Sequence, residues 1–208
     1  MSNAYAQITF TPNVRDEQRR FGSADAYARV LSPERQGGAV LTAHEAEFLT
    51  ARDGFFQATT SDTGWPYVQF RGGAPGFLKV IDARTLGYAD YRGNRQYISL
   101  GNLRHDDRIS LIAVDYARQK RLKLLGHAMI TEDPDVIDLL QVDDGPKAER
   151  GIVIHVDAFD WNCPLHIPIR LTDAERDHEI GRLNARIEQL EIRLRNAAAN
   201  KKADALQE

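Results

Sequence analysis

Cysteine is nearly absent from this chain, since its 208 residues include only Cys163. A single thiol cannot form an internal disulfide, and it cannot build a zinc site on thiolates. Cys163 lies three residues before His166, which could serve as a base for a nucleophilic thiol. A lone buried thiol is the simpler interpretation, and we expect Cys163 to be one.

The histidines also lack the spacing of a metal site. The six of them include no H-x-H and no H-x-x-x-H pair, the spacings that bring two imidazoles to one side of a strand or helix. We therefore expect no metal site.

Long hydrophobic runs are missing as well. No run approaches about 18 apolar residues, the length that a membrane-spanning helix needs. The first residues, "MSNAYAQITF", lack the uninterrupted apolar core of a signal peptide. We expect a cytoplasmic protein that does not associate with a membrane.

An excess of positive charge is absent too. The net charge is −3 and the pI is about 6.1, so nothing in the overall charge favours nucleic acid as a partner. Any anion-binding site must therefore be local.

Strand-forming residues fill the middle of the chain. Aromatic and β-branched residues, separated by short turns, predict strands at 54–61, 65–72, 76–82, 85–90, 108–116, 120–131 and 151–162. Most of them are joined as hairpins, which is typical of an antiparallel barrel or sandwich and not of a parallel sheet.

Helix signals lie between and around these strands. Thr42 and Glu45 form a capping box for a helix over 43–52, and Asp133 with Pro134 marks another helix start. A third helix is predicted over 93–103. The first ten residues read as irregular or extended, and one or two short surface helices should follow them.

The C-terminal segment has a different pattern. Thr172 and Glu175 form a second capping box, after which apolar residues recur at steps of three and four: Ile180, Leu183, Ile187, Leu190 and Leu194. This seam of about two and a half heptads must pack on the barrel or on a partner helix, and both arrangements are compatible with a dimer. We expect an N-terminal helical or irregular segment (1–40), a barrel (41–170), and an amphipathic helix with a polar tail (171–208).

The stretch "DYRGNRQYISLGNL" (90–103) places cations where a helix is predicted to begin. Gly93 allows a close backbone approach and Asn94 is a good N-cap. Arg92 and Arg95 oppose the helix dipole by roughly 0.3–1 kcal/mol each when exposed, a cost that a bound phosphate would reverse. Solvated arginines are the alternative.

A second cluster of arginine and glycine occurs in "QFRGGAPG" (69–76). Arg71 is followed by Gly72 and Gly73, which combine a cation with exposed backbone amides, although the glycines could form only a turn. Two such clusters at strand ends favour a site for a phosphate attached to a flat ring.

The run from Gly64 to Gly126 resembles the flavin-binding core of the pyridoxamine 5'-phosphate oxidase-like family, the FMN-binding split barrels. The shared order is a strand after "GWP", a hairpin, a strand ending in "GYAD", the basic helix start, "DRISL", and a strand containing "LLGHAMI". The nearest likeness is to the uncharacterised flavin-nucleotide-binding branch. The oxidase's own C-terminal substrate signature is replaced by "WNCPLHIPIR" and the heptad helix.

The resemblance implies a mainly β (α+β) fold. It would be a six-stranded antiparallel split β-barrel with short flanking helices and the C-terminal heptad helix. It also implies a homodimer with FMN in a groove between the subunits.

The resemblance assigns residues to the flavin site by their positions. The strand formed by Gln69, Phe70, Arg71 and Gly72 would line the isoalloxazine ring and the ribityl chain, with Tyr88 and Ala89 beside it. Asn94 and Arg95 would bind the phosphate. Arg121 occupies a position where many members have a glutamine near the ring, and Trp161 and Asn162 would close the site from the second subunit.

These features predict an FMN-dependent oxidoreductase acting on an unidentified small molecule. A non-catalytic flavin carrier or sensor that engages a partner through its C-terminal helix is one alternative, and an interaction module without a cofactor is another. No residue is assigned a catalytic role, because the flavin itself carries the redox chemistry.

Overall fold

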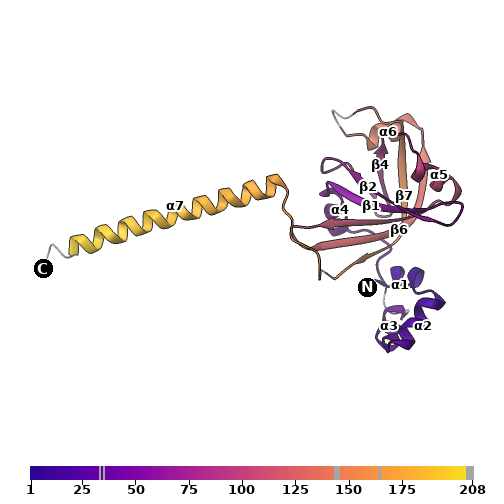
Figure 1. The fold of residues 1–208 in the computed structure, drawn as a ribbon, viewed down its shortest axis with the longest axis horizontal. Coiled ribbons are helices and arrows are strands. Elements are labelled where there is room, and N and C mark those ends of the chain that lie inside the picture. Colours follow the sequence, from indigo (N-terminus) through magenta and orange to yellow (C-terminus); the bar gives the residue numbers. More distant parts are fainter. Residues whose placement is uncertain (33, 35, 143–145, 164, 205–208) are drawn as a thin grey trace. The chain divides into compact units, whose positions relative to one another are not determined.

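The computed structural model describes residues 1–32, 34, 36–142, 146–163 and 165–204, with side chains up to residue 196. The chain divides into two compact units, Met1–Ile167 and Pro168–Glu208. The first contains the sheet, and the second contains the single long helix α7 (Asp173–Asp204) (Figure 1). The last residues of the predicted polar tail, 205–208, lie outside the described part.

Seven strands form one antiparallel sheet in the order β2-β1-β5-β6-β7-β4-β3. Their bounds are β1 (Gly54–Thr60), β2 (Pro66–Gly72), β3 (Lys79–Asp82), β4 (Thr85–Asp90), β5 (Arg108–Asp115), β6 (Lys120–Thr131) and β7 (Arg150–Trp161). The prediction of a mainly β, antiparallel split barrel is confirmed, with seven strands where six were expected.

The three predicted hairpins, β1–β2, β3–β4 and β5–β6, are all present. In the first, Phe55 of β1 pairs with Arg71 of β2, and Gln57 pairs with Gln69.

β6 and β7 pair along most of their length, with a bulge after Leu125. A side chain at Gly126 would collide with the carbonyl oxygen of His155, so only glycine fits at this bulge.

The core fills the inside of the curved sheet. Alternate residues of β5 and β6 are buried, as the strand period of two requires, whereas β4 is buried over most of its length. The buried cluster includes Phe55, Leu86, Tyr88, Ile109, Leu111, Leu122, Leu124, Ile154 and Val156. On its other side, β4 is covered by helix α6 (Pro134–Leu140), whose Leu140 packs beside Ala89.

Two of the flanking helices begin at the predicted caps. α4 (Ala43–Thr50) has the capping box of Thr42 and Glu45, and α6 has Asp133 as N-cap and Pro134 in its first turn. The fifth helix, α5 (Ile98–His105), follows β4.

The expectation of irregular structure over the first ten residues is wrong. Residues Asn3–Thr9 form α1, which is followed by α2 (Pro12–Arg20), α3 (Ala24–Ala28) and the short 3₁₀ helix η1 (Arg29–Leu31). Figure 1 shows these helices gathered beside the barrel. Tyr5 and Ala6 are buried, and Asn3 Nδ2 donates to the carbonyl of Val30 at 2.8 Å. Tertiary packing thus stabilises α1, a helix too short for its sequence alone to predict.

Within the described residues, no helix is both long enough and apolar enough to cross a membrane.

Glu45 ties α4 to the end of β7. Its Oε2 accepts hydrogen bonds from the Thr42 backbone N–H at 3.0 Å and from the Thr42 hydroxyl at 2.5 Å, while its Oε1 accepts one from Trp161 Nε1 at 2.8 Å. Burial by itself would raise the pKa of Glu45, but the hydrogen bonds from Thr42 and Trp161 outweigh it and lower the pKa from 4.5 to about 2.

We predict that Glu45→Gln lowers the free energy of unfolding at pH 7 by roughly 1–3 kcal/mol, because an amide N–H would face another donor. The folded-state pKa lies below the unfolded one. The carboxylate therefore stabilises the fold above about pH 4.5, and this contribution is lost as the pH falls towards 2. Urea denaturation should show the gap between wild type and variant narrowing over that interval. Glu47→Gln, at an exposed position of the same helix, is the control and should have little effect. A gap that stays constant from pH 7 to pH 2.5 would contradict the assignment.

Candidate functional site

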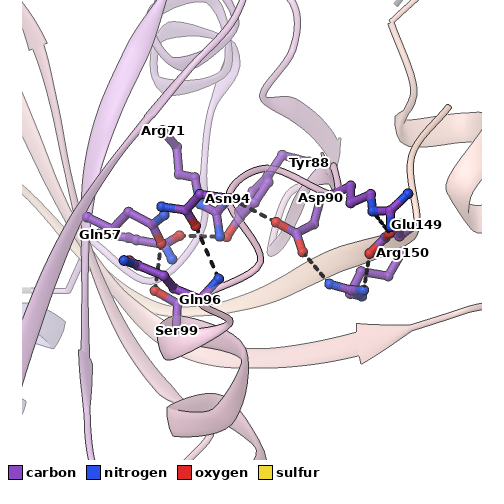
Figure 2. Close-up of polar contacts among 11 residues, drawn as sticks. Gln57, Arg71, Tyr88, Asp90, Asn94, Gln96, Ser99, Glu149 and Arg150 are labelled. Carbon is purple, nitrogen blue, oxygen red and sulfur yellow. Dashed lines mark hydrogen bonds and ion pairs between the residues drawn. The ribbon is translucent and has the colours of Figure 1, made fainter. Parts of the chain in front are cut away.

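A polar cavity of about 290 Å³ lies between β2 and the loop that leads into α5. Its lining consists of Tyr67, Gln69 and Arg71 from β2, Asp90 at the end of β4, and residues 91–100 of the loop and helix start. We call it the β2 cavity. Figure 2 shows polar side chains from several strands converging beside it.

The alternation of β2 selects which side chains reach this cavity. Tyr67, Gln69 and Arg71 share one face of the strand, and Gln69 Oε1 accepts a hydrogen bond from the Ser99 hydroxyl at 2.8 Å. Phe70 lies on the opposite face, where it is 57% exposed and contacts Phe56. Of the four residues predicted on this strand, Gln69 and Arg71 line the cavity, whereas Phe70 and Gly72 do not.

The loop before α5 turns through three left-handed residues. Gly93, Arg95 and Tyr97 have φ angles of +49°, +62° and +53°, and the Asn94 side chain accepts a hydrogen bond from the Gln96 N–H at 3.2 Å. Because left-handed residues interrupt a right-handed helix, α5 begins only at Ile98 with Tyr97 as its N-cap. The predicted helix start at 93, with Asn94 as N-cap, is wrong.

The elements expected to bind an anion are nevertheless close together. Asn94 and Arg95 line the cavity beside Ile98, Ser99 and Leu100, whose N–H groups precede the first hydrogen bond within the helix, from Gly101 to Tyr97. Arg95 is exposed and makes no hydrogen bond or ion pair with another described residue. A free guanidinium beside free amides can hold a phosphate.

A buried carboxylate organises the other end of the cavity. Asp90 is 6% exposed, and its two oxygens accept hydrogen bonds from Arg71 Nη1 at 2.8 Å and Arg150 Nη1 at 3.0 Å. Arg150 also donates to Glu149 at 2.5 Å, and Arg92 approaches Glu149 at 4.0 Å. Burial opposes the charge of Arg150, but Asp90 and Glu149 raise its pKa above the usual value.

A second polar contact crosses the barrel interior behind Arg71. The hydroxyl of Tyr88 donates to Gln57 Oε1 at 2.5 Å, although three strands separate β1 from β4 in the sheet. Burial raises the pKa of Tyr88 above its ordinary value of 10.0, so the phenol is neutral. The Arg71 guanidinium lies 5.6 Å from the centre of the Tyr88 ring.

Two buried donors in this network have no partner. Arg71 Nε and Gln57 Nε2 are both enclosed, and neither donates a hydrogen bond to a described residue. An unsatisfied buried N–H costs about 1–3 kcal/mol, so its presence calls for an explanation. Arg71 also lines the cavity, so this incompletely paired guanidinium lies next to the space that a ligand could occupy.

The remaining predicted residues fall into two groups. Gly72, Gly73, Tyr88 and Ala89 line a second cavity of about 350 Å³ that shares Arg71 and Tyr91 with the β2 cavity. The Gly73 N–H donates to the Asp53 carbonyl at 3.0 Å. The expectation of exposed amides after Arg71 is therefore not met at Gly73.

The other group, Arg121, Trp161 and Asn162, lies where β6 and β7 meet α4. The Asn162 N–H donates to the Arg121 carbonyl at 3.1 Å, and the Trp161 ring packs against Phe48 with 4.7 Å between ring centres. None of the three lines the β2 cavity of its own chain. Arg121 Nε is a further buried donor without a partner among the described residues.

Sequence reasoning did not identify several residues of the network. Asp90 opens the basic stretch 90–103, and its position at the end of a predicted strand was the sequence signal that could have marked it as a site residue. Gln57 and Arg150 carry no local signal, because each is brought to the network by a distant strand.

The single cysteine also differs from its prediction, because Cys163 is exposed.

No group of three or more potential metal ligands is found within the described residues.

Comparison with known proteins places this geometry in context. The family model for pyridoxamine 5'-phosphate oxidase matches residues 41–161, more than half of the chain. No curated protein matches the chain.

Solved structures with a similar backbone share little sequence. HupZ from Group A Streptococcus is 16% identical with a TM-score of 0.49, covering 64% of this chain and 100% of that one. A putative pyridoxamine 5'-phosphate oxidase from Lactobacillus delbrueckii is 22% identical with a TM-score of 0.45, covering 58% and 93%. An FMN-binding protein from Syntrophomonas wolfei is 9% identical with a TM-score of 0.46, covering 70% and 97%.

We predict that Asp90→Asn lowers the free energy of unfolding by about 3 kcal/mol, since it leaves Arg71 without its counter-charge and leaves Arg150 paired with Glu149 alone. Chemical denaturation at pH 7 measures the change. Asp62→Asn, at an exposed turn, controls for loss of a carboxylate and should change stability by less than about 0.5 kcal/mol. Equal effects of the two substitutions would show that Asp90 does not organise the site.

Proposed function

This chain belongs to the pyridoxamine 5'-phosphate oxidase family, and from that premise we propose that it binds FMN in the β2 cavity. We further propose that it is an oxidoreductase acting on a small molecule. The observation that carries the proposal is that one cavity brings together Arg95, which is unpaired among the described residues, the first backbone amides of α5, and the side chains of Gln69 and Arg71.

The phosphate end of the flavin would be bound by the loop before α5. Arg95 and Asn94 supply side-chain donors, and the first amides of α5 supply backbone donors. Three arginines and one aspartate line the cavity, which gives it a charge of +2. A phosphate monoester carries nearly two negative charges at pH 7, so the charges match.

The ring and ribityl chain would lie along β2. Gln69 offers an amide, Tyr67 an aromatic surface, and Arg71 the positive charge of its guanidinium. When bound, the flavin supplies the electron transfer. The chain's own residues hold and orient it, and the positive charge of Arg71 tunes its electronics.

The size of the cavity supports a dimeric site. At about 290 Å³, it is at the lower end of ligand pockets, so one chain would cover only part of a three-ring cofactor. We propose that a second subunit covers the rest. Arg121, Trp161 and Asn162, which do not reach the cavity of their own chain, would contribute from that subunit.

The first test is whether the purified protein carries flavin. We expect a yellow preparation, or one that quenches the fluorescence of added FMN in a saturable titration. A colourless protein that also fails to bind added FMN, FAD or a deazaflavin would overturn the proposal.

We predict that Arg95→Ala weakens FMN binding roughly 10–100-fold, the effect of removing one hydrogen bond to a charged group. Riboflavin has no phosphate, so its affinity should be nearly unchanged. Arg104→Ala, which removes an exposed arginine of α5 outside the cavity, is the matched control. If Arg95→Ala weakens FMN and riboflavin equally, then Arg95 does not contact the phosphate.

Reduction of the bound flavin separates an enzyme from a carrier or sensor. For an oxidoreductase, we predict that NADH or NADPH bleaches the flavin absorbance without oxygen, and that air restores it. Bound flavin that neither nucleotide reduces would favour the non-catalytic alternative.

A further inference from the structure

Helix α7 carries an apolar stripe that nothing in its own unit covers. Ile180, Leu183, Ile187, Leu190 and Leu194 are 48%, 46%, 54%, 43% and 70% exposed. A helix with such a stripe is poorly stabilised in water unless another surface buries it. A capping box stabilises the start of the helix. The Thr172 hydroxyl accepts a hydrogen bond from the Glu175 N–H at 3.2 Å, and the Glu175 carboxylate accepts one from the Thr172 N–H at 3.0 Å.

The stripe has the composition of a two-stranded coiled coil. Its a positions are Ile180, Ile187 and Leu194, and its d positions are Leu183 and Leu190. β-branched residues at a with leucine at d favour parallel dimers over trimers and tetramers. All five layers are apolar.

The charges beside the stripe select a second copy in parallel orientation. In a parallel pair, each g residue faces the e residue of the partner's next heptad. Arg186 at g then faces the partner's Glu191 at e, and the symmetry of the pair repeats this contact on the other side. The preceding pair, Glu179 with Asn184, involves no like charges.

Antiparallel pairing is less favourable. The best two antiparallel alignments of the stripe each bury four layers of large side chains, which is one layer fewer than the parallel alignment buries. In one, Arg186 meets its own copy and Asp177 meets Glu191 on both sides, so like charges oppose one another at three contacts, against two attractive contacts between Glu179 and Arg193. In the other, Arg186 meets Arg193 on both sides. The parallel alignment sets opposite charges together and has no like-charge contact between g and e residues.

We propose that α7 pairs with α7 of a second copy of this chain, parallel and in register, as a two-stranded coiled coil over residues 180–194. Five layers make a short coiled coil, and Gly181 on its outer surface weakens the helix further. The pairing is therefore strongest where another contact between the same two chains raises the effective concentration of the helices. It does not depend on flavin, because α7 lies outside both the β2 cavity and the family match.

Cysteine cross-linking of the full chain tests the pairing and its direction. In a Cys163→Ser background, Leu183→Cys places a thiol at a d position, where a parallel, in-register pair brings it against its own copy within disulfide reach. Ala185→Cys, two residues away at an f position, points away from the partner and is the matched control. We expect oxidation to convert most of the Leu183→Cys chain to a covalent dimer, with at least tenfold less dimer for Ala185→Cys.

The outcomes that overturn the proposal are distinct. If Leu183→Cys alone gives no dimer, but the Leu183→Cys chain cross-links to a co-expressed Ile187→Cys or Leu194→Cys chain, the helices are antiparallel, because a positions face d positions in an antiparallel pair. If neither gives a dimer, or if Ala185→Cys cross-links as well as Leu183→Cys, the helices do not form this coiled coil. The visible spectrum of each sample reports flavin binding separately, so loss of one property is not mistaken for loss of the other.

Charge reversal provides a second measurement. Glu191→Arg should weaken self-association several-fold, as should Arg186→Glu, because each sets like charges opposite one another on both sides of the pair. The double variant, Arg186→Glu with Glu191→Arg, should restore association to near the wild-type level. Sedimentation equilibrium measures all three variants. A double variant as weak as either single variant would contradict the parallel register.

Discussion

The carboxylate of Asp90 joins parts of the barrel that backbone hydrogen bonds leave apart. β2 is the first strand of the sheet and β4 the sixth, yet Asp90 of β4 binds Arg71 of β2 directly. Its other oxygen binds Arg150, from the neighbouring β7. A buried carboxylate is tolerated only when paired in this way. The sheet must therefore curl until the arginines reach it.

The β2 cavity is a consequence of this closure. The ion pair fixes the end of the Arg71 side chain against Asp90, and its buried Nε has no acceptor among the described residues. On the inner side, a neutral hydrogen bond between Tyr88 and Gln57 links β4 to β1. On the outer side, Arg95 remains unpaired among the described residues. The result is a positively charged recess with one rigid end and one open end, which suits a ligand that has a ring and a phosphate.

Local sequence signals predicted most of the elements. The capping box of Thr42 and Glu45, the cap at Asp133 and the three hairpins depend on interactions within a few residues, and the structure contains them all. Predictions failed where distant contacts decide the outcome. α1 is helical because the fold buries Tyr5 and Ala6, and Phe70 faces away from the cavity because the pairing of β2 with β1 fixes which side chains point inward.

The sequence by itself determined the antiparallel barrel, the basic character of the stretch at 92–95 and the heptad stripe of α7, because composition, periodicity and capping are local properties. It also determined that Arg71, Asn94 and Arg95 were candidates for one site. Only the tertiary structure decided that Asp90 and Arg150 complete that site and that α5 starts at Ile98. It also decided that Trp161 packs on α4 and not in the cavity. These outcomes depend on strand register and on the curl of the sheet, which bring together residues up to 116 positions apart.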